Sequence, residues 1–162
     1  MGTNKALSGV WIFGDYRNYF QNRVTLQLIA KGKELATKRN TKVTALLLGE
    51  QVQQYAMEYV AHGADLVIAA EHPDLKEYQV ESYCALVAQW VETFEPEIFL
   101  AGATSFGREF CPRLAKRLGT GLSADCVALE VDPKTGLLLQ TTPAFGGELL
   151  AEVVTPNHRP QM

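Results

Sequence analysis

Short apolar runs alternate with amphipathic stretches through the first two-thirds of the chain. The apolar runs are rich in β-forming residues and most are followed by glycine, which is typical of buried strands. We expect strands at Val10–Phe13, Thr41–Leu48, Asp65–Ala70 and Glu97–Ala101. After each run, apolar residues recur at spacings of three and four, which predicts helices over Asn22–Arg39, Val52–Val60, Val80–Phe94 and Ser105–Leu118. This alternation of strands and helices favours right-handed crossovers and a parallel sheet.

Pro112 falls inside the last of these predicted helices. Because proline lacks the backbone N–H and its ring clashes with the preceding turn, we expect a kink or a restart of the helix there.

The last third of the chain has a different pattern, with short apolar stretches separated by strong turn signals. Cys126–Val131, Leu137–Thr142 and Leu149–Val154 are the expected strands, and Asp132–Gly136 is the clearest turn. Strands joined by tight turns pair antiparallel. The expected fold class is therefore α/β, a doubly wound, mostly parallel sheet with an antiparallel extension at one edge near the C-terminus. We expect residues 1–155 to form this domain and the polar residues 156–162 to begin a linker.

Composition narrows the function classes. With 162 residues, 47% of them hydrophobic, the chain suits one domain with a sizeable core. A net charge of −3 and 20% charged residues are typical neither of a disordered acidic chain nor of a nucleic-acid binder. No apolar run is long enough for a membrane span, and Met1–Ser8 lacks the apolar core of a signal peptide. A cytoplasmic location is the default expectation.

The cysteines and histidines do not form a pattern that indicates a metal site. Cys84, Cys111 and Cys126 are far apart and include no Cys-x-x-Cys pair, so we expect buried free thiols rather than zinc or iron–sulfur ligands. The three histidines are equally scattered, which favours structural or surface roles.

The sharpest local signal is Ala101–Glu109, which lies where a strand ends and a helix begins. Free N–H groups at a helix N-terminus favour an anion. In the strand order 3-2-1-4, the first and fourth strands are neighbours at the point where ligands bind such sheets. The first strand would then bring Asp15 beside this loop. The candidate anion or nucleotide loop comprises Asp15, Gly102, Thr104, Ser105, Gly107 and Arg108.

A purely structural interpretation of the same residues also stands. Ser105 would only cap the helix, the glycines would only permit a turn, and Arg108 would pair with a neighbouring carboxylate. The segment is neither a P-loop nor Gly-x-Gly-x-x-Gly, and Ser105 lacks the Gly-x-Ser-x-Gly elbow of a hydrolase nucleophile. The spacing therefore favours a nucleotide-binding type of fold without catalytic residues.

Several segments together carry a resemblance to a known family. Residues 101–109, 112–115 and 118–126, with Pro143–Gly147 and Arg159–Met162, closely resemble the N-terminal domain of electron-transfer flavoprotein alpha subunits. The resemblance runs over nearly the whole chain. Thr142 and Glu148 depart from the family pattern, which has arginine and asparagine there.

The resemblance implies a two-part subunit. Its N-terminal α/β domain is akin to adenine-nucleotide α-hydrolase and universal-stress folds, and its C-terminal part binds FAD. It pairs with a beta subunit of related fold that holds AMP or a second flavin. The pair carries electrons from dehydrogenases, often acyl-CoA dehydrogenases, to a quinone reductase or another acceptor. Residues 156–162 would begin the linker to the FAD domain, so no FAD ligand is assigned to this chain.

Three hypotheses follow from residues and resemblance together. The leading one is a scaffold domain of a heterodimeric electron carrier, which docks the beta subunit and is not itself an enzyme. The alternative is a stand-alone nucleotide-binding module of universal-stress type that uses Asp15 and Gly102–Arg108. The third, an enzyme that uses Ser105 or Arg108, lacks a visible base–nucleophile pair.

Overall fold

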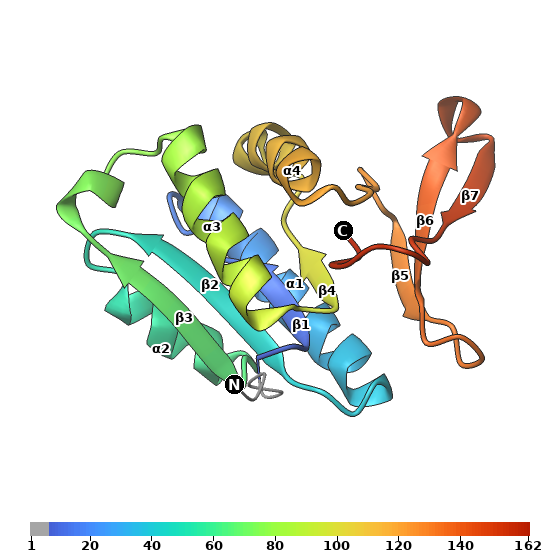
Figure 1. Ribbon diagram of the computed structural model, residues 1–162, viewed down its shortest axis with the longest axis horizontal. Helices are drawn as coiled ribbons and strands as arrows, with labels where there is room; N and C mark the ends of the chain where they lie inside the picture. The colour runs from blue at the N-terminus through green and yellow to red at the C-terminus, as the bar shows by residue number, and fades with distance from the viewer. Residues whose placement is uncertain (1–6) are drawn as a thin grey trace.

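A four-stranded parallel sheet forms the centre of the computed structural model, which describes residues 7–162 (Figure 1). Its strands are β1 (Val10–Phe13), β2 (Val43–Gly49), β3 (Leu66–Glu71) and β4 (Ile98–Leu100). They lie in the order β3-β2-β1-β4 and all pair in parallel. The α/β class and the strand order expected from the sequence are confirmed.

Helices cover both faces of this sheet, so its strands are buried on both sides. The helices are α1 (Tyr19–Lys38), α2 (Gln53–Ala61), α3 (Val80–Phe94) and α4 (Ser105–Leu118), with a short 3₁₀ turn at Pro73–Leu75. Val10 and Ile12 of β1 pack in the cluster that includes α1 and α2, whereas Trp11 and Phe13 pack with α3 and α4. Because successive side chains of a strand point to opposite faces, one continuous apolar run supplies both cores.

Helices α1 and α4 differ from the prediction, α1 in where it begins and α4 in its continuity. Helix α1 begins at Tyr19, three residues before the expected start, because Asn18 caps it: the Asn18 Oδ1 accepts the Gln21 N–H at 2.9 Å. Helix α4 is a single helix from Ser105 to Leu118, so the expected restart at Pro112 does not occur. Phe110 and Leu114 are fully buried on either side of Pro112. Their packing holds the helix together despite the lost backbone hydrogen bond.

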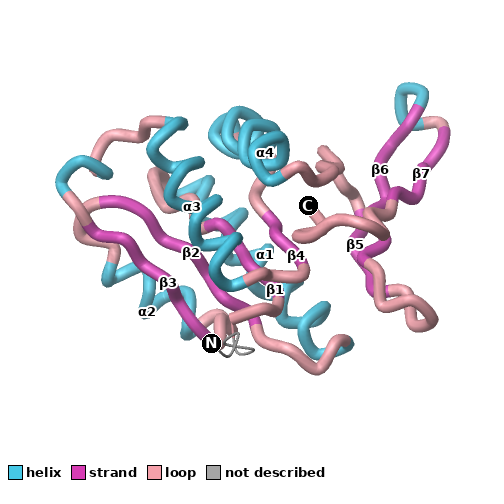
Figure 2. Tube along the Cα trace, viewed as in Figure 1, coloured by secondary structure: helices cyan, strands magenta, loops and turns pink. Residues whose placement is uncertain are grey.

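The antiparallel strands form a sheet of their own. They are β5 (Ala128–Val131), β6 (Leu138–Ala144) and β7 (Leu149–Val153), in the order β5-β6-β7, with a 3₁₀ turn at Phe145–Gly147. Figure 2 shows these strands beside the parallel sheet, with β6 and β7 extending away from it. The antiparallel pairing is confirmed, but the expected extension at one edge of the parallel sheet is corrected to a separate second sheet.

The C-terminal tail occupies the free edge of β4. The Gln161 N–H donates to the Glu97 carbonyl at 2.9 Å, and the Phe99 N–H donates to the Gln161 carbonyl at 3.0 Å. Gln161 and Met162 are buried. The packed part of the chain therefore runs to Met162, beyond the boundary expected at residue 155.

Among residues 7–162, no helix has both the length and the apolar character that crossing a bilayer requires. Most of Met1–Ser8, where the signal-peptide expectation falls, lies outside the described residues.

Candidate functional site

Asp15 and Thr104 meet where β1 and β4 end side by side. The Thr104 hydroxyl donates to the Asp15 Oδ2 at 3.0 Å. The guanidinium of Arg17 donates twice to the Asp15 Oδ1, at 2.9 Å from Nε and 2.7 Å from Nη2. Asp15 is only 3% exposed, and its N–H donates to the Thr25 hydroxyl. The strand order thus brings Asp15 beside the loop that begins α4.

Thr104, rather than Ser105, caps α4. Its Oγ1 accepts the Gly107 N–H at 3.2 Å, whereas Ser105 is exposed. Through Thr104, the Asp15 carboxylate lies close to the helix N-terminus, where a negative charge is favourable. Asp15 thereby brings a negative charge near this end of the helix, and a phosphate close to it would face a like charge.

The two glycines of the loop allow close packing within the protein. A Cβ at Gly107 would collide with the Gly102 carbonyl, and a Cβ at Gly102 would lie 2.7 Å from the Cγ1 of Val24 on α1. The sequence suggested that these glycines remove side chains that would block a ligand. In the folded chain, the space that a Cβ would need is taken by backbone at Gly107 and by α1 at Gly102, and both glycines also line the cleft described below.

Arg108 pairs with Asp125. The structural interpretation of the sequence expected Arg108 to pair with a neighbouring carboxylate, without naming one. The two guanidinium Nη atoms donate to the two carboxylate oxygens of Asp125 at 3.1 and 2.6 Å. Both side chains are more than half exposed, at 58% and 52%. An exposed pair of this kind contributes about 0.2–1 kcal/mol. Its main effect is to tie the start of α4 to the segment that precedes β5.

Arg17 is a member of this site that the sequence analysis missed. Its guanidinium lies 3.7 Å from the centre of the Phe106 ring and 5.0 Å from that of Tyr78, besides its bonds to Asp15. A guanidinium held between a carboxylate and aromatic faces is stabilised by both. Its position two residues after Asp15 could have indicated that Arg17 belongs to the site. The contact with the Phe106 ring could not be foreseen, because Phe106 lies on α4 and is distant in sequence.

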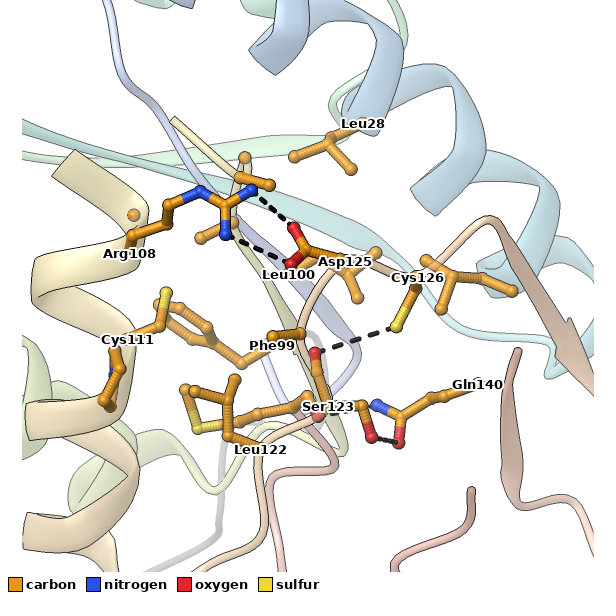
Figure 3. A pocket seen from close by; sticks show the side chains of 18 of the residues that line it. Leu28, Phe99, Leu100, Arg108, Cys111, Leu122, Ser123, Asp125, Cys126 and Gln140 are labelled. Atoms are coloured by element: carbon orange, nitrogen blue, oxygen red, sulfur yellow. Dashed lines mark hydrogen bonds and ion pairs between the residues drawn. The ribbon is translucent and has the colours of Figure 1, made fainter. Parts of the chain in front are cut away.

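A cleft of about 420 Å³ lies between β4, α1, α4 and the segment 122–126 (Figure 3). Figure 3 shows Arg108 and Asp125 on one side of it, and Ser123 and Gln140 on another. The Ser123 hydroxyl donates to the Gln140 Oε1 at 2.8 Å, and the Gln140 Nε2 donates to the Met162 carbonyl at 2.6 Å. The apolar wall consists mainly of Val24, Leu28, Phe99, Leu100, Cys111, Pro112, Leu122, Leu129 and Met162.

All three cysteines are free thiols, but they differ in burial. Cys84 and Cys111 are buried, and this burial raises their pKa values to about 11 and about 12. Cys126, which the sequence suggested was buried, is only partly so; burial and the nearby Asp125 carboxylate still raise its pKa. Its Sγ lies 3.7 Å from the Ser123 carbonyl.

This difference predicts the order of thiol modification. In the native protein at mildly alkaline pH, we expect iodoacetamide to modify Cys126 first, because it alone is partly exposed. Cys84 and Cys111 should react only in denaturant. Mass spectrometry of the alkylated protein measures this, with Cys126→Ser as the control. Native labelling of Cys111 before Cys126 would contradict the packing of α4.

The part of the chain that the structure describes contains no group of three or more His, Cys, Asp or Glu side chains placed to hold a metal ion. His62 and His72 are exposed and make local contacts: the His62 Nδ1 lies 2.8 Å from the Glu58 carbonyl, and the His72 Nδ1 accepts the Asp74 N–H. They fit the surface roles expected from the sequence.

The family model described as the electron transfer flavoprotein domain matches residues 10–162. The chain belongs to the electron transfer flavoprotein family. The electron transfer flavoprotein subunit alpha of Clostridium acetobutylicum is 43% identical over 160 residues, which are 98% of this chain and 48% of that protein. The resemblance stated from the sequence is confirmed.

Other electron transfer flavoprotein relatives bear different names. Protein FixB of Azorhizobium caulinodans is 40% identical over 161 residues, 98% of this chain and 43% of that protein. The lactate dehydrogenase (NAD(+),ferredoxin) subunit LctC of Acetobacterium woodii is 39% identical over 153 residues, 94% of this chain and 36% of that protein. The chain thus spans about half or less of the length of the curated relatives it matches.

Proposed function

We propose that this chain is the N-terminal scaffold domain of an electron transfer flavoprotein alpha subunit. It docks the beta subunit and supports an FAD-binding half, so that electrons pass from a dehydrogenase to an acceptor through flavins held outside this domain. The family match over residues 10–162 and the roughly doubled length of the relatives support this proposal.

The observation that carries the docking role is the apolar surface of the β6–β7 hairpin. Phe145, Leu149 and Leu150 are 81%, 59% and 67% exposed, and Val153 and Val154 are also exposed. We call these five residues the hairpin patch. Figure 1 shows the hairpin projecting from the body of the domain. A cluster of large apolar side chains in water is typical of a protein interface.

The backbone of β7 adds to this surface. In the order β5-β6-β7, only one edge of β7 is paired with β6. An unpaired strand edge is a template for another strand, and apolar side chains beside it supply affinity. A partner protein with a strand or an apolar face of its own matches this surface better than a small molecule does.

FAD does not fit the described residues. A pyrophosphate would bind at the start of α4. The Asp15 carboxylate, which accepts a hydrogen bond from the capping residue Thr104, already places a negative charge near that position. In the cleft, Ser123 and Gln140 bond to each other and to the tail rather than pointing into free space. We therefore infer that electrons do not pass through this domain, whose role is to hold the flavin-binding parts in reach of one another. The same Asp15 charge disfavours the alternative of a stand-alone nucleotide-binding module.

The names of relatives support a dehydrogenase as the electron donor. One is a lactate dehydrogenase subunit, and another, from Anaerotignum propionicum, is named acryloyl-CoA reductase electron transfer subunit beta. We infer that this domain serves a complex of the same general type, with a dehydrogenase such as an acyl-CoA dehydrogenase as donor. AMP or a second flavin would be held by the beta subunit.

A charge in the hairpin patch is expected to weaken docking of the beta subunit. The wild-type chain should co-purify with its cognate beta subunit, and Leu150→Glu should weaken the complex at least about tenfold, because a carboxylate would be buried at the interface without a partner. Co-purification and isothermal titration calorimetry measure this. The isolated chain should be colourless.

The matched control is Met57→Glu, since Met57 is 78% exposed but lies on α2 rather than on the hairpin. It should bind the beta subunit like the wild type. Equal binding by Leu150→Glu and the wild type would refute docking through the hairpin patch. Tightly bound FAD in the purified chain would refute the assignment of the flavin to the other half.

A further inference from the structure

The backbone of β7 has hydrogen-bonding groups that point away from its own sheet. β7 lies at one edge of that sheet, beside β6 (Figure 1). Pro143 on β6 lies opposite Leu150 on β7, and proline has no N–H to donate across this pair. In an antiparallel ladder, residues of a pair that exchanges no hydrogen bonds point their N–H and C=O groups outward. Leu150 therefore directs both groups to the free edge, and so does Glu152 two residues later.

The other side of β6 supports this assignment. The Val127 N–H donates to the Thr141 carbonyl at 2.8 Å, so the backbone of Thr141 points toward β5. Thr141 is the residue opposite Glu152, which is therefore not bonded to β6. Within residues 7–162, neither the Leu150 nor the Glu152 N–H donates to another segment of the backbone. Both residues offer a donor and an acceptor to a further strand.

The side chains of β7 show what such a strand must carry. Leu149, Ala151 and Val153 share one face of the strand, because alternate side chains of a strand point the same way. Leu149 and Val153 are exposed, and Ala151 is partly buried. This face is apolar along its whole length, so the strand that pairs with β7 must supply apolar side chains at the same spacing.

A second copy of β7 meets both requirements in one register. When two antiparallel copies are related by a two-fold axis at Ala151, Leu150 of each copy lies opposite Glu152 of the other. Each of these two pairs can exchange two hydrogen bonds through the free backbone groups. On the apolar face, Leu149 lies opposite Val153 of the second copy and Ala151 opposite its own counterpart.

The glutamates of the hairpin disfavour the neighbouring registers. A two-fold axis at Leu150 would place Glu152 directly opposite Glu148 of the second copy. An axis at Glu152 would place the two Glu152 carboxylates opposite each other. Like charges in directly opposite positions destabilise an antiparallel pair. The register centred on Ala151 has no such pair of like charges.

Charges at the two ends of β7 are complementary in this same register. Glu148 directly precedes the strand and is exposed. The Arg159 Nη1 donates to the Thr155 carbonyl at 3.2 Å, which holds the guanidinium beside the other end of the strand. Neither Glu148 nor Arg159 has an ion-pair partner within the described residues. With the axis at Ala151, Glu148 of each copy lies opposite Val154 of the other, one residue from Thr155 and thus near the Arg159 guanidinium.

We propose that this chain, when no other partner is bound, forms a symmetric dimer in which β7 pairs antiparallel with β7 of a second copy. The two sheets would join into one continuous sheet, in the order β5-β6-β7-β7-β6-β5. Such a two-fold contact is self-complementary and closes both β7 edges. The inference does not require the proposed function, but it uses the same hairpin, so the second copy and the beta subunit compete for it.

Sedimentation equilibrium of the isolated chain over a range of micromolar concentrations tests the dimer, and we expect the mass of two chains. Glu152→Pro removes an outward N–H while it leaves the bonds between β6 and β7 in place, so it should halve the mass. The matched control is Glu152→Thr, which loses the same carboxylate but keeps the N–H and should remain dimeric. Circular dichroism checks that both variants are folded.

Cysteine crosslinking tests the register without a change in the backbone. In a Cys126→Ser background, Ala151→Cys places two thiols opposite each other, with their Cα atoms about 4.5 Å apart. Diamide, which takes two electrons and two protons from a pair of thiols, should then join the two chains through a disulfide. Leu149→Cys is the control. Its two thiols would lie four residues apart along the pair, about 13 Å, and should not crosslink.

The mass of a single chain at every concentration would overturn the inference. A dimer that Glu152→Pro leaves intact, or equal crosslinking of Ala151→Cys and Leu149→Cys, would do the same. The cognate beta subunit gives a separate readout, because it should replace the second copy. A monomeric chain that binds the beta subunit would leave the proposed function standing and remove the dimer. A dimer that binds the beta subunit without dissociating would keep β7 pairing and refute docking through the hairpin patch.

Discussion

Replacing Phe110 with alanine is expected to lower the free energy of unfolding by about 3–5 kcal/mol. Phe110 is fully buried on α4, with ring centres 5.1 Å from Phe106 and 4.8 Å from Phe13. The change removes both aromatic contacts and leaves a cavity between α4 and the sheet. Since whole domains of this kind are stable by about 5–15 kcal/mol, the variant should lie near the limit of folding.

Urea denaturation followed by circular dichroism measures this change, provided that the slope of the transition is unchanged. The matched control is Phe145→Ala, because Phe145 is 81% exposed. It should alter the free energy of unfolding by less than about 0.5 kcal/mol. If Phe110→Ala were no more destabilising than Phe145→Ala, the packing of α4 on the parallel sheet would be wrong.

Replacing Asp15 with alanine is expected to lower the free energy of unfolding by about 2–3 kcal/mol. Asp15 is 3% exposed and accepts hydrogen bonds from Thr104 and Arg17. Without the carboxylate, the Thr104 hydroxyl loses its acceptor and the Arg17 guanidinium loses its counter-ion. The side chain of Arg17 is 29% exposed, so water compensates in part, which places this effect below that of Phe110.

Asp15→Asn is the control for charge. Asparagine is nearly the same size as aspartate, and its amide oxygen can still accept a hydrogen bond from Thr104. We therefore expect a smaller loss of unfolding free energy than with alanine. The difference between the two variants separates packing and hydrogen bonding from the ion pair. Thermal unfolding measures both. If Asp15→Ala had the same melting temperature as the wild type, the Asp15–Thr104 hydrogen bond would not help to hold β1 to α4.

Hydrophobic periodicity predicted the parallel sheet well because burial on both faces leaves a clear trace in sequence. Val10–Phe13 is apolar at every position, and all four side chains are buried, alternately against α1 and α4. The strand order was inferred from the general behaviour of doubly wound sheets, and it is confirmed. Helix limits were less well predicted: the start of α1 depends on one hydrogen bond, which the Asn18 Oδ1 accepts from the Gln21 N–H.

The strand–helix pattern places the loop at the start of α4, whereas the contacts that its residues make do not follow from the sequence. A glycine that admits a ligand and a glycine that admits another backbone look the same in sequence. At Gly107 the neighbour is the Gly102 carbonyl, and only the folded chain shows this. Likewise, Arg108 was expected to pair with a carboxylate, but Asp125 lies 17 residues further along the chain and no periodicity connects the two.

The sequence by itself determined the α/β class, the parallel core, the antiparallel pairing of the last strands and the family, because these depend on local patterns and on long matching segments. The tertiary structure alone decided that the antiparallel strands form a second sheet and that the tail pairs with β4. It also decided that Asp15 accepts a hydrogen bond from Thr104, the residue that caps α4. The physical reason is that these contacts join residues far apart in the chain. Their hydrogen-bonding and charged groups can pair only after the core has packed and brought the residues together.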